Sequence, residues 1–504
     1  MKANYQSVSS IRRLCSASGQ SIVECRLNGG EIASVLLCEP TVCLAQATCG
    51  NGEIEYSGKL VLAFLYEDVE GKICRTERGA EFYHKAEHPQ IAPAHTLSGE
   101  LSVQGVKLRR EGGQLIASCI VEAKFDVFGE QRYTYVSGGE GLQVRKERAA
   151  VYNRYTATAT VEEEDEFECD FAKDVLLHTE CATVTEVRTG MGEVGVLGEL
   201  CMRFCLLKED GSLCSYERMT PMKAQVLLDT VGADSVCRAK LRILSARVSA
   251  ATDEERKKSK IVLSYQVQVE VCADEKTEID CVVDAYATDV EVALKRENIA
   301  TRYALAAKTT TERVHGTPIF GGSLPEGGKL IAVVCPKTAV SLQKGDDGWE
   351  LQGVIEAKAL YQPVEGGVES VDVALPLLLP MLGAEQDGRA WTDAEVECSI
   401  YGFGLRVRAD GETEAEGTVR VRITPYVDGE TVYLSEVVEG EKKPQKTCAV
   451  SVYMPTCGED AWTLSKRLSM TEETLKNSNP HLIFPLKGEE RILVYRQKQE
   501  NLQK

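Results

Sequence analysis

The chain has 504 residues, of which 43% are hydrophobic and 27% charged, and its formal net charge is −19. This length exceeds what one hydrophobic core supports and predicts roughly three or four domains. The negative charge disfavours nucleic acid and anionic membranes as partners, because no basic patch is segregated in the sequence. No apolar run approaches the ~18 residues that would span a bilayer, so we expect no membrane insertion.

The compartment is predicted from the N-terminus and the cysteines. The first residues run into Ile11 without the apolar core of a signal peptide. The 19 cysteines stand singly in strand-like runs with no CxxC pair, and the nearest approaches, Cys38 to Cys43 and Cys201 to Cys205, lack the second half of a zinc site. Buried, reduced thiols fit this pattern best. We therefore expect a cytoplasmic protein.

Similar strand-like segments recur along the first 450 residues. Gly58–Tyr66, Gly198–Leu206 and Gly353–Tyr361 each place a glycine before an apolar run of period two, which is typical of a half-buried strand. An apolar strand precedes each of them, and an acidic or glycine-bearing turn follows, as in hairpins. Such repetition at matching offsets predicts three copies of one structural unit.

The later part of each unit also repeats. Long alternating runs occupy Gln114–Phe125, Lys260–Val271 and Gly417–Tyr426. Val144–Arg148 and Leu294–Asn298 agree as well, and we interpret them as the ends of the first two units. The sequence thus predicts β-rich, sandwich-like repeats at 20–160, 161–325 and 326–446, in a mainly β fold of antiparallel sheets.

Three further sequence features have both a structural and a functional interpretation. The acidic run Glu162–Asp170 is typical of a solvated linker or strand edge, and otherwise of a site for a cation or basic partner. His84 and His88 fit the H-x-x-E-H pattern of a metallopeptidase, but Pro89 and the absence of histidine in the other copies favour a solvated loop. Ser323–Lys329 only partly matches a phosphate-binding loop. We expect no catalysis, no cofactor and no metal.

The last fifty residues change character. A strand is predicted at Ala449–Met454, and a helix opens after Gly458 and continues through Trp462, Leu464 and Leu468. A second helix is capped by Thr471 with two glutamates in its first turn, and Ile492–Tyr495 closes the unit as a strand. This order predicts a small βααβ domain over 447–497. Within it, Trp462 is interpreted as the core anchor of its helix, with an exposed contact as the alternative.

This C-terminal unit resembles a LysM domain. Gly458-Glu-Asp-Ala-Trp462 stands where that family usually carries Gly-Asp-Thr-Leu-Trp, and Asn479-Pro480 follows in the expected order. The three upstream repeats resemble the SPOCS family, as does the short signature Asp284–Asp289. The resemblance implies a spore-coat morphogenetic protein of clostridia, acting in the mother cell at the forespore surface, whose LysM-like domain binds the coat morphogenetic ATPase.

The resemblance also implies the binding residues. These are Gly458, Glu459, Asp460, Trp462, Lys466 and Asn479. Glycan-binding LysM domains use the Gly-Asp-Thr region to hold acetamido groups, and Glu459 and Asp460 here would place two carboxylates at that rim. Because a carboxylate only accepts hydrogen bonds, we expect a protein partner rather than peptidoglycan. The function expected is non-enzymatic assembly in sporulation, with possible self-association; the alternatives are a glycan-binding protein and a metal hydrolase using His84 and His88.

Overall fold

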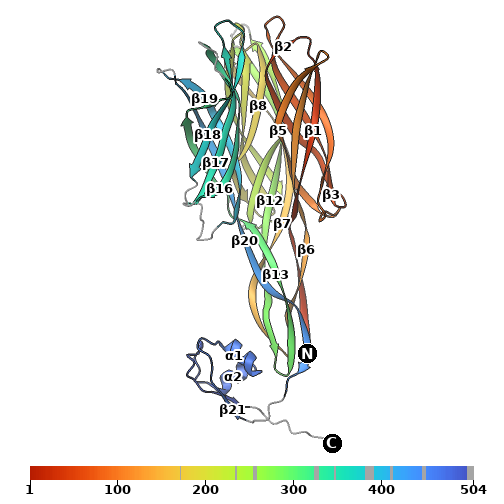
Figure 1. Ribbon diagram of the computed structural model, residues 1–504, viewed down its shortest axis with the longest axis vertical. Coiled ribbons are helices and arrows are strands. Elements are labelled where there is room, and N and C mark those ends of the chain that lie inside the picture. The colour runs from red at the N-terminus through yellow and green to blue at the C-terminus, as the bar shows by residue number, and fades with distance from the viewer. Residues whose placement is uncertain are drawn as a thin grey trace.

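The computed structural model describes residues 1–170, 172–232, 235–253, 258–322, 328–345, 348–380, 391–408, 412–444 and 450–495. The described chain is mainly β, in antiparallel sheets, with two short helices near its C-terminal end. Long strands run lengthwise through an elongated body that narrows into a stalk (Figure 1). The N-terminus lies at the narrow end, and both helices lie beside it.

The first repeat consists of two facing three-stranded sheets. Its strands are β1 (Lys2–Asn28), β2 (Ile32–Cys49), β3 (Glu53–Asp68), β4 (Ile73–Glu87), β5 (Thr96–Glu111) and β6 (Gln114–Glu140). One sheet has the order β2-β3-β4 and the other β1-β6-β5. Apolar side chains of the two sheets, including Leu60, Phe64 and Val121, form a common core between them. This arrangement is a sandwich, as the sequence predicts.

The second repeat has the same topology. Its strands are β7 (Leu142–Asp170), β8 (Asp174–Thr189), β9 (Glu193–Leu207), β10 (Leu213–Leu227), β11 (Val236–Asp253) and β12 (Lys258–Ala287). The sheet orders are β10-β9-β8 and β11-β12-β7, which match those of the first repeat strand for strand.

The third repeat repeats this plan with its first strand divided in two. Its strands are β13 (Val290–Ala304), β14 (Lys308–Gly316), β15 (Ile319–Phe320), β16 (Lys329–Gly345), β17 (Gly348–Gln362), β18 (Glu369–Pro380), β19 (Asp393–Val407) and β20 (Thr413–Lys442). Both β13 and β14 pair with β20, which also pairs with β19, while β16, β17 and β18 form the facing sheet.

The three glycines singled out in the sequence occupy equivalent positions. Gly58, Gly198 and Gly353 each lie in a strand that is paired on both sides, β3, β9 or β17. A Cβ at Gly58 would lie 2.9 Å from the carbonyl oxygen of Cys43, and one at Gly198 would lie 2.9 Å from that of Thr183. Gly353 faces the carbonyl oxygen of Ala339 in the same way. Each glycine therefore permits a close approach of the neighbouring strand.

Strand pairing divides the repeats differently from the boundaries expected. The start at residue 20 lies within β1, and the boundary at 160/161 lies within β7, which pairs with β12 along its length. Val144–Arg148 and Leu294–Asn298 accordingly begin the second and third repeats instead of ending the first two. By pairing, the repeats are 2–140, 142–287 and 290–442. The expected boundaries at 325/326 and 446/447 lie outside the described residues.

The repeats pack around a common core at two levels. In the body, a cluster combines Leu36 and Leu37 with Leu176 and Leu177 and with Val334, Cys335 and other apolar residues, so all three repeats contribute. In the stalk, the pairs β1–β6, β7–β12 and β13–β20 continue beyond the sandwiches as three ribbons. Val136, Val282 and Leu434, one from each ribbon, meet in the stalk core. Three similar units thus form one continuous body.

The C-terminal unit has the predicted βααβ order. It comprises β21 (Val450–Tyr453), α1 (Ala461–Leu468), α2 (Glu472–Ser478) and β22 (Ile492–Tyr495), with β21 paired to β22. The side chain of Asp460 caps α1 by accepting from the Thr463 N–H, and Thr471 caps α2. Leu464, Leu475, Ile492 and neighbouring residues give the unit a core of its own.

Candidate functional site

The C-terminal unit rests against the end of the stalk, and we call the contact the docking site. It is formed on the unit by Trp462, Lys466 and the backbone of Met470, and on the stalk by Asp284 and Tyr286. Trp462 and Lys466 are four residues apart on α1, so they share one face of the helix. The docking site therefore joins the C-terminal unit to the segment Asp284–Asp289.

Asp284 is at the centre of the docking site. Its Oδ2 accepts a hydrogen bond of 2.8 Å from the Trp462 indole N–H. The Lys466 Nζ lies 2.6 and 2.7 Å from its two carboxylate oxygens, and an Arg296 nitrogen lies 3.1 Å from Oδ1. Burial by itself would raise the pKa of Asp284, but the hydrogen bonds from Lys466 and Trp462 outweigh burial and lower it. Asp284 is thus held as a carboxylate.

Tyr286 supplies the apolar part of the docking site. Its ring meets the Trp462 ring edge to face, with 4.9 Å between centroids and 69° between planes. The Tyr286 hydroxyl donates to the carbonyl oxygen of Met470 at 2.8 Å. Lys443 adds a bridge, because its Nζ contacts the Ala287 carbonyl oxygen at 2.8 Å and the Ser469 Oγ at 3.1 Å. Trp462 is therefore a contact residue and not the core anchor of its helix.

Asp460 and Gly458 have structural roles and remain near the surface. Asp460 caps α1, and its Oδ2 also lies 3.4 Å from Arg145 on the stalk. The hydrogen bonds at Thr463 lower the pKa of Asp460. Gly458 has a φ of +84°, a conformation that favours glycine, and its N–H donates to the Leu486 carbonyl oxygen.

Glu459 and Asn479 are buried, which corrects the expectation that Glu459 lies at a binding rim. Glu459 is 8% exposed, and its Oε2 accepts from Arg467 at 3.0 Å and from the Thr456 N–H at 3.1 Å. It lies before the cap of α1, outside the first helical turn. Asn479 is 1% exposed and exchanges hydrogen bonds with the backbone of Leu493, which ties α2 to β22. Both side chains hold the unit together.

The stalk half of the docking site was not among the residues expected to bind. In the sequence, this half can be recognised because its residues differ from those at the equivalent positions of the other two repeats. Val136, Val282 and Leu434 are equivalent, since each precedes a register shift in its ribbon, so Gly138 and Glu436 stand where the second repeat has Asp284. A residue that departs from its copies in a repeat is a candidate for function instead of fold.

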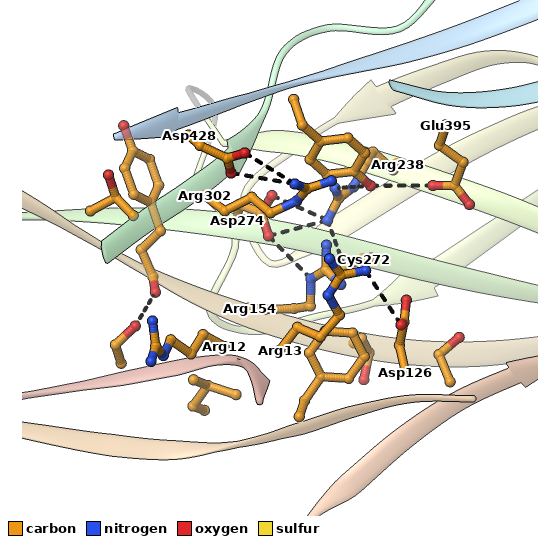
Figure 2. Close-up of a pocket in the computed structure, with 18 of the residues that line it drawn as sticks. Arg12, Arg13, Asp126, Arg154, Arg238, Cys272, Asp274, Arg302, Glu395 and Asp428 are labelled. Atoms are coloured by element: carbon orange, nitrogen blue, oxygen red, sulfur yellow. Dashed lines mark hydrogen bonds and ion pairs between the residues drawn. The ribbon is translucent and has the colours of Figure 1, made fainter. Parts of the chain in front are cut away.

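A cavity of about 610 Å³ lies where the body meets the stalk, lined by all three repeats. Figure 2 shows Arg13, Arg154, Arg238 and Arg302 converging there. Each of the four is paired with an acid that lines the cavity. Arg238 lies 3.1 Å from Asp274 and Arg302 lies 2.5 Å from Asp393, while Arg154 also pairs with Asp274 and Arg13 pairs with Asp126.

Several of these contacts join different repeats. Arg238, on β11, donates to the hydroxyl of Tyr426, on β20, at 2.8 Å. Lys240 pairs with Glu395, and Arg154 of the second repeat lies over the ring of Phe128 of the first, 4.6 Å from its centroid. The polar and charged side chains that line the cavity therefore connect the three repeats, and their charges are paired with each other.

The weaker patterns fall on strands or outside the described chain. His84 lies on β4, paired with Tyr56, and not in a loop or helix, while His88 follows in a turn. Glu162–Asp170 lies on β7 and is paired with β12. Residues 323–327 lie outside the described residues. Among the residues that the structure describes, no group of three or more His, Cys, Asp or Glu could hold a metal ion.

Neither helix of the described ranges is long and apolar enough to cross a bilayer. Comparisons with protein-family models, with curated proteins and with solved structures found no match to this chain.

Proposed function

We propose that this chain is a non-enzymatic assembly protein of bacterial sporulation. In this proposal three SPOCS-like repeats form its body, and the LysM-like unit recruits a protein partner, the coat morphogenetic ATPase, at the forespore surface. The observation that carries it is architectural: three units of one topology form an elongated body, and a separately cored unit is attached at its end. Such a body offers an extended surface for contacts with partner proteins.

Charge supports a protein partner. The chain carries a net charge of −19, so a partner with a basic surface would be attracted to it, while nucleic acid and anionic lipid would be repelled. On the C-terminal unit itself, Lys466 and Trp462 present a cation and an indole N–H, which together suit a carboxylate on a protein.

The direct test is binding of the purified coat morphogenetic ATPase to the full chain and to a chain that lacks residues 447–504. We expect binding by the full chain and its loss on truncation. Asp280→Ala is a matched control within the full chain. Asp280 also lies on β12, its side chain is exposed, and its ion pair with Arg148 is long, at 4.0 Å. Equal binding by the truncated chain would contradict the proposal.

Peptidoglycan binding is retained as the alternative, and one observation favours it. Glu459 is turned inward, which leaves Asp460 as the one carboxylate of the pair near the surface. One of the two carboxylates expected to disfavour a neutral glycan is therefore turned away from the surface. Sedimentation with purified peptidoglycan and with chitin oligomers separates the two functions. We expect weak binding that Asp460→Thr strengthens; micromolar binding by the unaltered chain would favour the glycan.

A further inference from the structure

The side of α1 that carries Trp462 and Lys466 is occupied by the chain's own stalk. Asp284 satisfies the Trp462 indole N–H and the Lys466 ammonium together, and Tyr286 covers the Trp462 ring. We call this side, with the Met470 carbonyl, the Trp462 face. An indole has a single N–H donor, so a second carboxylate cannot use it while Asp284 does.

We infer that the Trp462 face is a recognition surface for a protein segment that presents a carboxylate beside an aromatic ring, and that Asp284 and Tyr286 close it in cis as a latch. The partner's segment and the stalk tip then compete for one surface. The latch itself stands on the contacts above, while its effect on a partner rests on the function proposed for this unit.

The contact has the properties of a reversible one. The C-terminal unit keeps a core of its own, built from Leu464, Leu475, Ile492 and others, so undocking does not dismantle it. The Asp284 and Lys466 side chains are 21% and 39% exposed in the docked state, so water screens the pair in part. Contacts between domains of one chain that include charged and polar groups commonly allow the domains to move relative to each other.

Only one of the three ribbons is built for this contact. Gly138 and Glu436 occupy the positions equivalent to Asp284, and Glu140 and Val438 those equivalent to Tyr286. No other ribbon therefore combines a carboxylate with an aromatic ring there. If Asp284 and Tyr286 served only to stabilise the stalk, we would expect a carboxylate and an aromatic ring at the equivalent positions of the other two ribbons as well.

The latch is tested in the full chain by the indole signals of its three tryptophans, with ¹⁵N-labelled tryptophan and Trp462→Phe for assignment. Asp284→Ala should shift the Trp462 signal and speed its indole exchange with solvent by about tenfold or more, as expected for loss of a hydrogen bond to a charged group. The signals of Trp349 and Trp391, stacked together in the third repeat, should not move.

Asp280→Ala, on the same strand, should leave all three signals in place. Unchanged Trp462 exchange in Asp284→Ala would overturn the latch. The measurement is repeated at tenfold dilution, because protection that falls on dilution would mean that a second copy supplies Asp284, which also contradicts a latch in cis.

Competition between the partner and the latch is tested with the binding assay proposed above. Asp284→Ala should bind the partner several-fold more tightly, since the competitor is removed, whereas Trp462→Ala should bind weakly. Loss of binding in both variants would mean that the docked form is the active one and would overturn competition. If truncation leaves partner binding intact, the proposed function fails, yet the indole measurement still decides whether the latch exists.

Discussion

The indole N–H of Trp462 donates to a carboxylate oxygen of Asp284, 178 residues earlier in the chain, at 2.8 Å. The same carboxylate receives Lys466, one helical turn further along α1. This relationship places Trp462 on the one ribbon that combines an acid with an aromatic ring at these positions. The orientation of the unit on the stalk can therefore be altered by single substitutions.

Tyr286→Phe should weaken docking without abolishing it. The variant keeps the ring against Trp462 but loses the hydroxyl that donates to Met470. We expect a loss of about 1 kcal/mol in the docking equilibrium, as for one neutral hydrogen bond. The Trp462 indole exchange rate measures it, and Tyr286→Ala should show a larger effect. A Tyr286→Phe variant indistinguishable from the parent would contradict this role.

Acid should release the C-terminal unit. The pKa of Asp284 is lower when docked than when free, so docking gains stability above the ordinary pKa and loses it as pH falls through the docked value. The charged groups facing it are Lys466 on α1 and Arg296 on β13, while Arg145 faces Asp460. We expect a constant docked fraction from pH 7 to about 5 and release below about pH 4.

The indole signal of Trp462 followed from pH 7 to 3 provides the measurement. Asp284→Asn is the control: its weaker docking should lose most of this pH dependence. A release that keeps its midpoint in the Asn variant would assign the titration to another group.

Gly198→Ala should destabilise the second repeat. The new Cβ would lie 2.6 Å from Leu241 Cδ1 and 2.9 Å from the Thr183 carbonyl oxygen. We expect about 1–3 kcal/mol of lost unfolding free energy, which is the usual cost of overpacking. Gly195→Ala on the same strand is the matched control, because its Cβ would meet Arg188 at 3.8 Å, an ordinary contact. Chemical denaturation of both variants would show the difference; equal midpoints would contradict it.

Cys457 should be the fastest-reacting thiol of the described cysteines. It alone among them is exposed. Burial raises the pKa of Cys38 and of Cys205 to about 12, so both thiols remain protonated at neutral pH; Cys205 is buried and Cys38 partly buried. Timed alkylation followed by peptide mapping should find Cys457 modified first, Cys38 more slowly, and Cys205 only after unfolding. Early modification of Cys205 would contradict its burial in the core to which all three repeats contribute.

Local signals in the sequence predict local structure well here. Asp460 and Thr471 cap the helices as their residue types indicate, and the three glycines mark equivalent strands because crowding at that point recurs in each copy. The expected boundaries cut β1 short and place the starts of the second and third repeats in the preceding copy, because β1, β7 and β13 pair with the last strand of their own repeat, far along the chain. Alternation within a strand carries no information about such distant pairing.

Of the docking site, the residues on the C-terminal unit could be predicted from the sequence, but those on the stalk could not. Trp462 and Lys466 could be found from the motif, but the side of α1 on which Trp462 lies depends on what packs against the helix. Glu459 shows the same limit, because its burial is set by Arg467 and the Thr456 backbone in the folded loop. Asp284 could be found only by comparing the repeats position by position, which requires the register shifts seen in the ribbons.

In the function proposed above, the C-terminal unit recruits the repeat body to an assembly surface. The most direct measurement is the location of the fluorescently tagged full chain in sporulating cells, compared with a chain that lacks residues 447–504 at matched expression. We predict that the full chain collects around the forespore and that the truncated chain is spread through the mother cell. A truncated chain that still surrounds the forespore would contradict the claim.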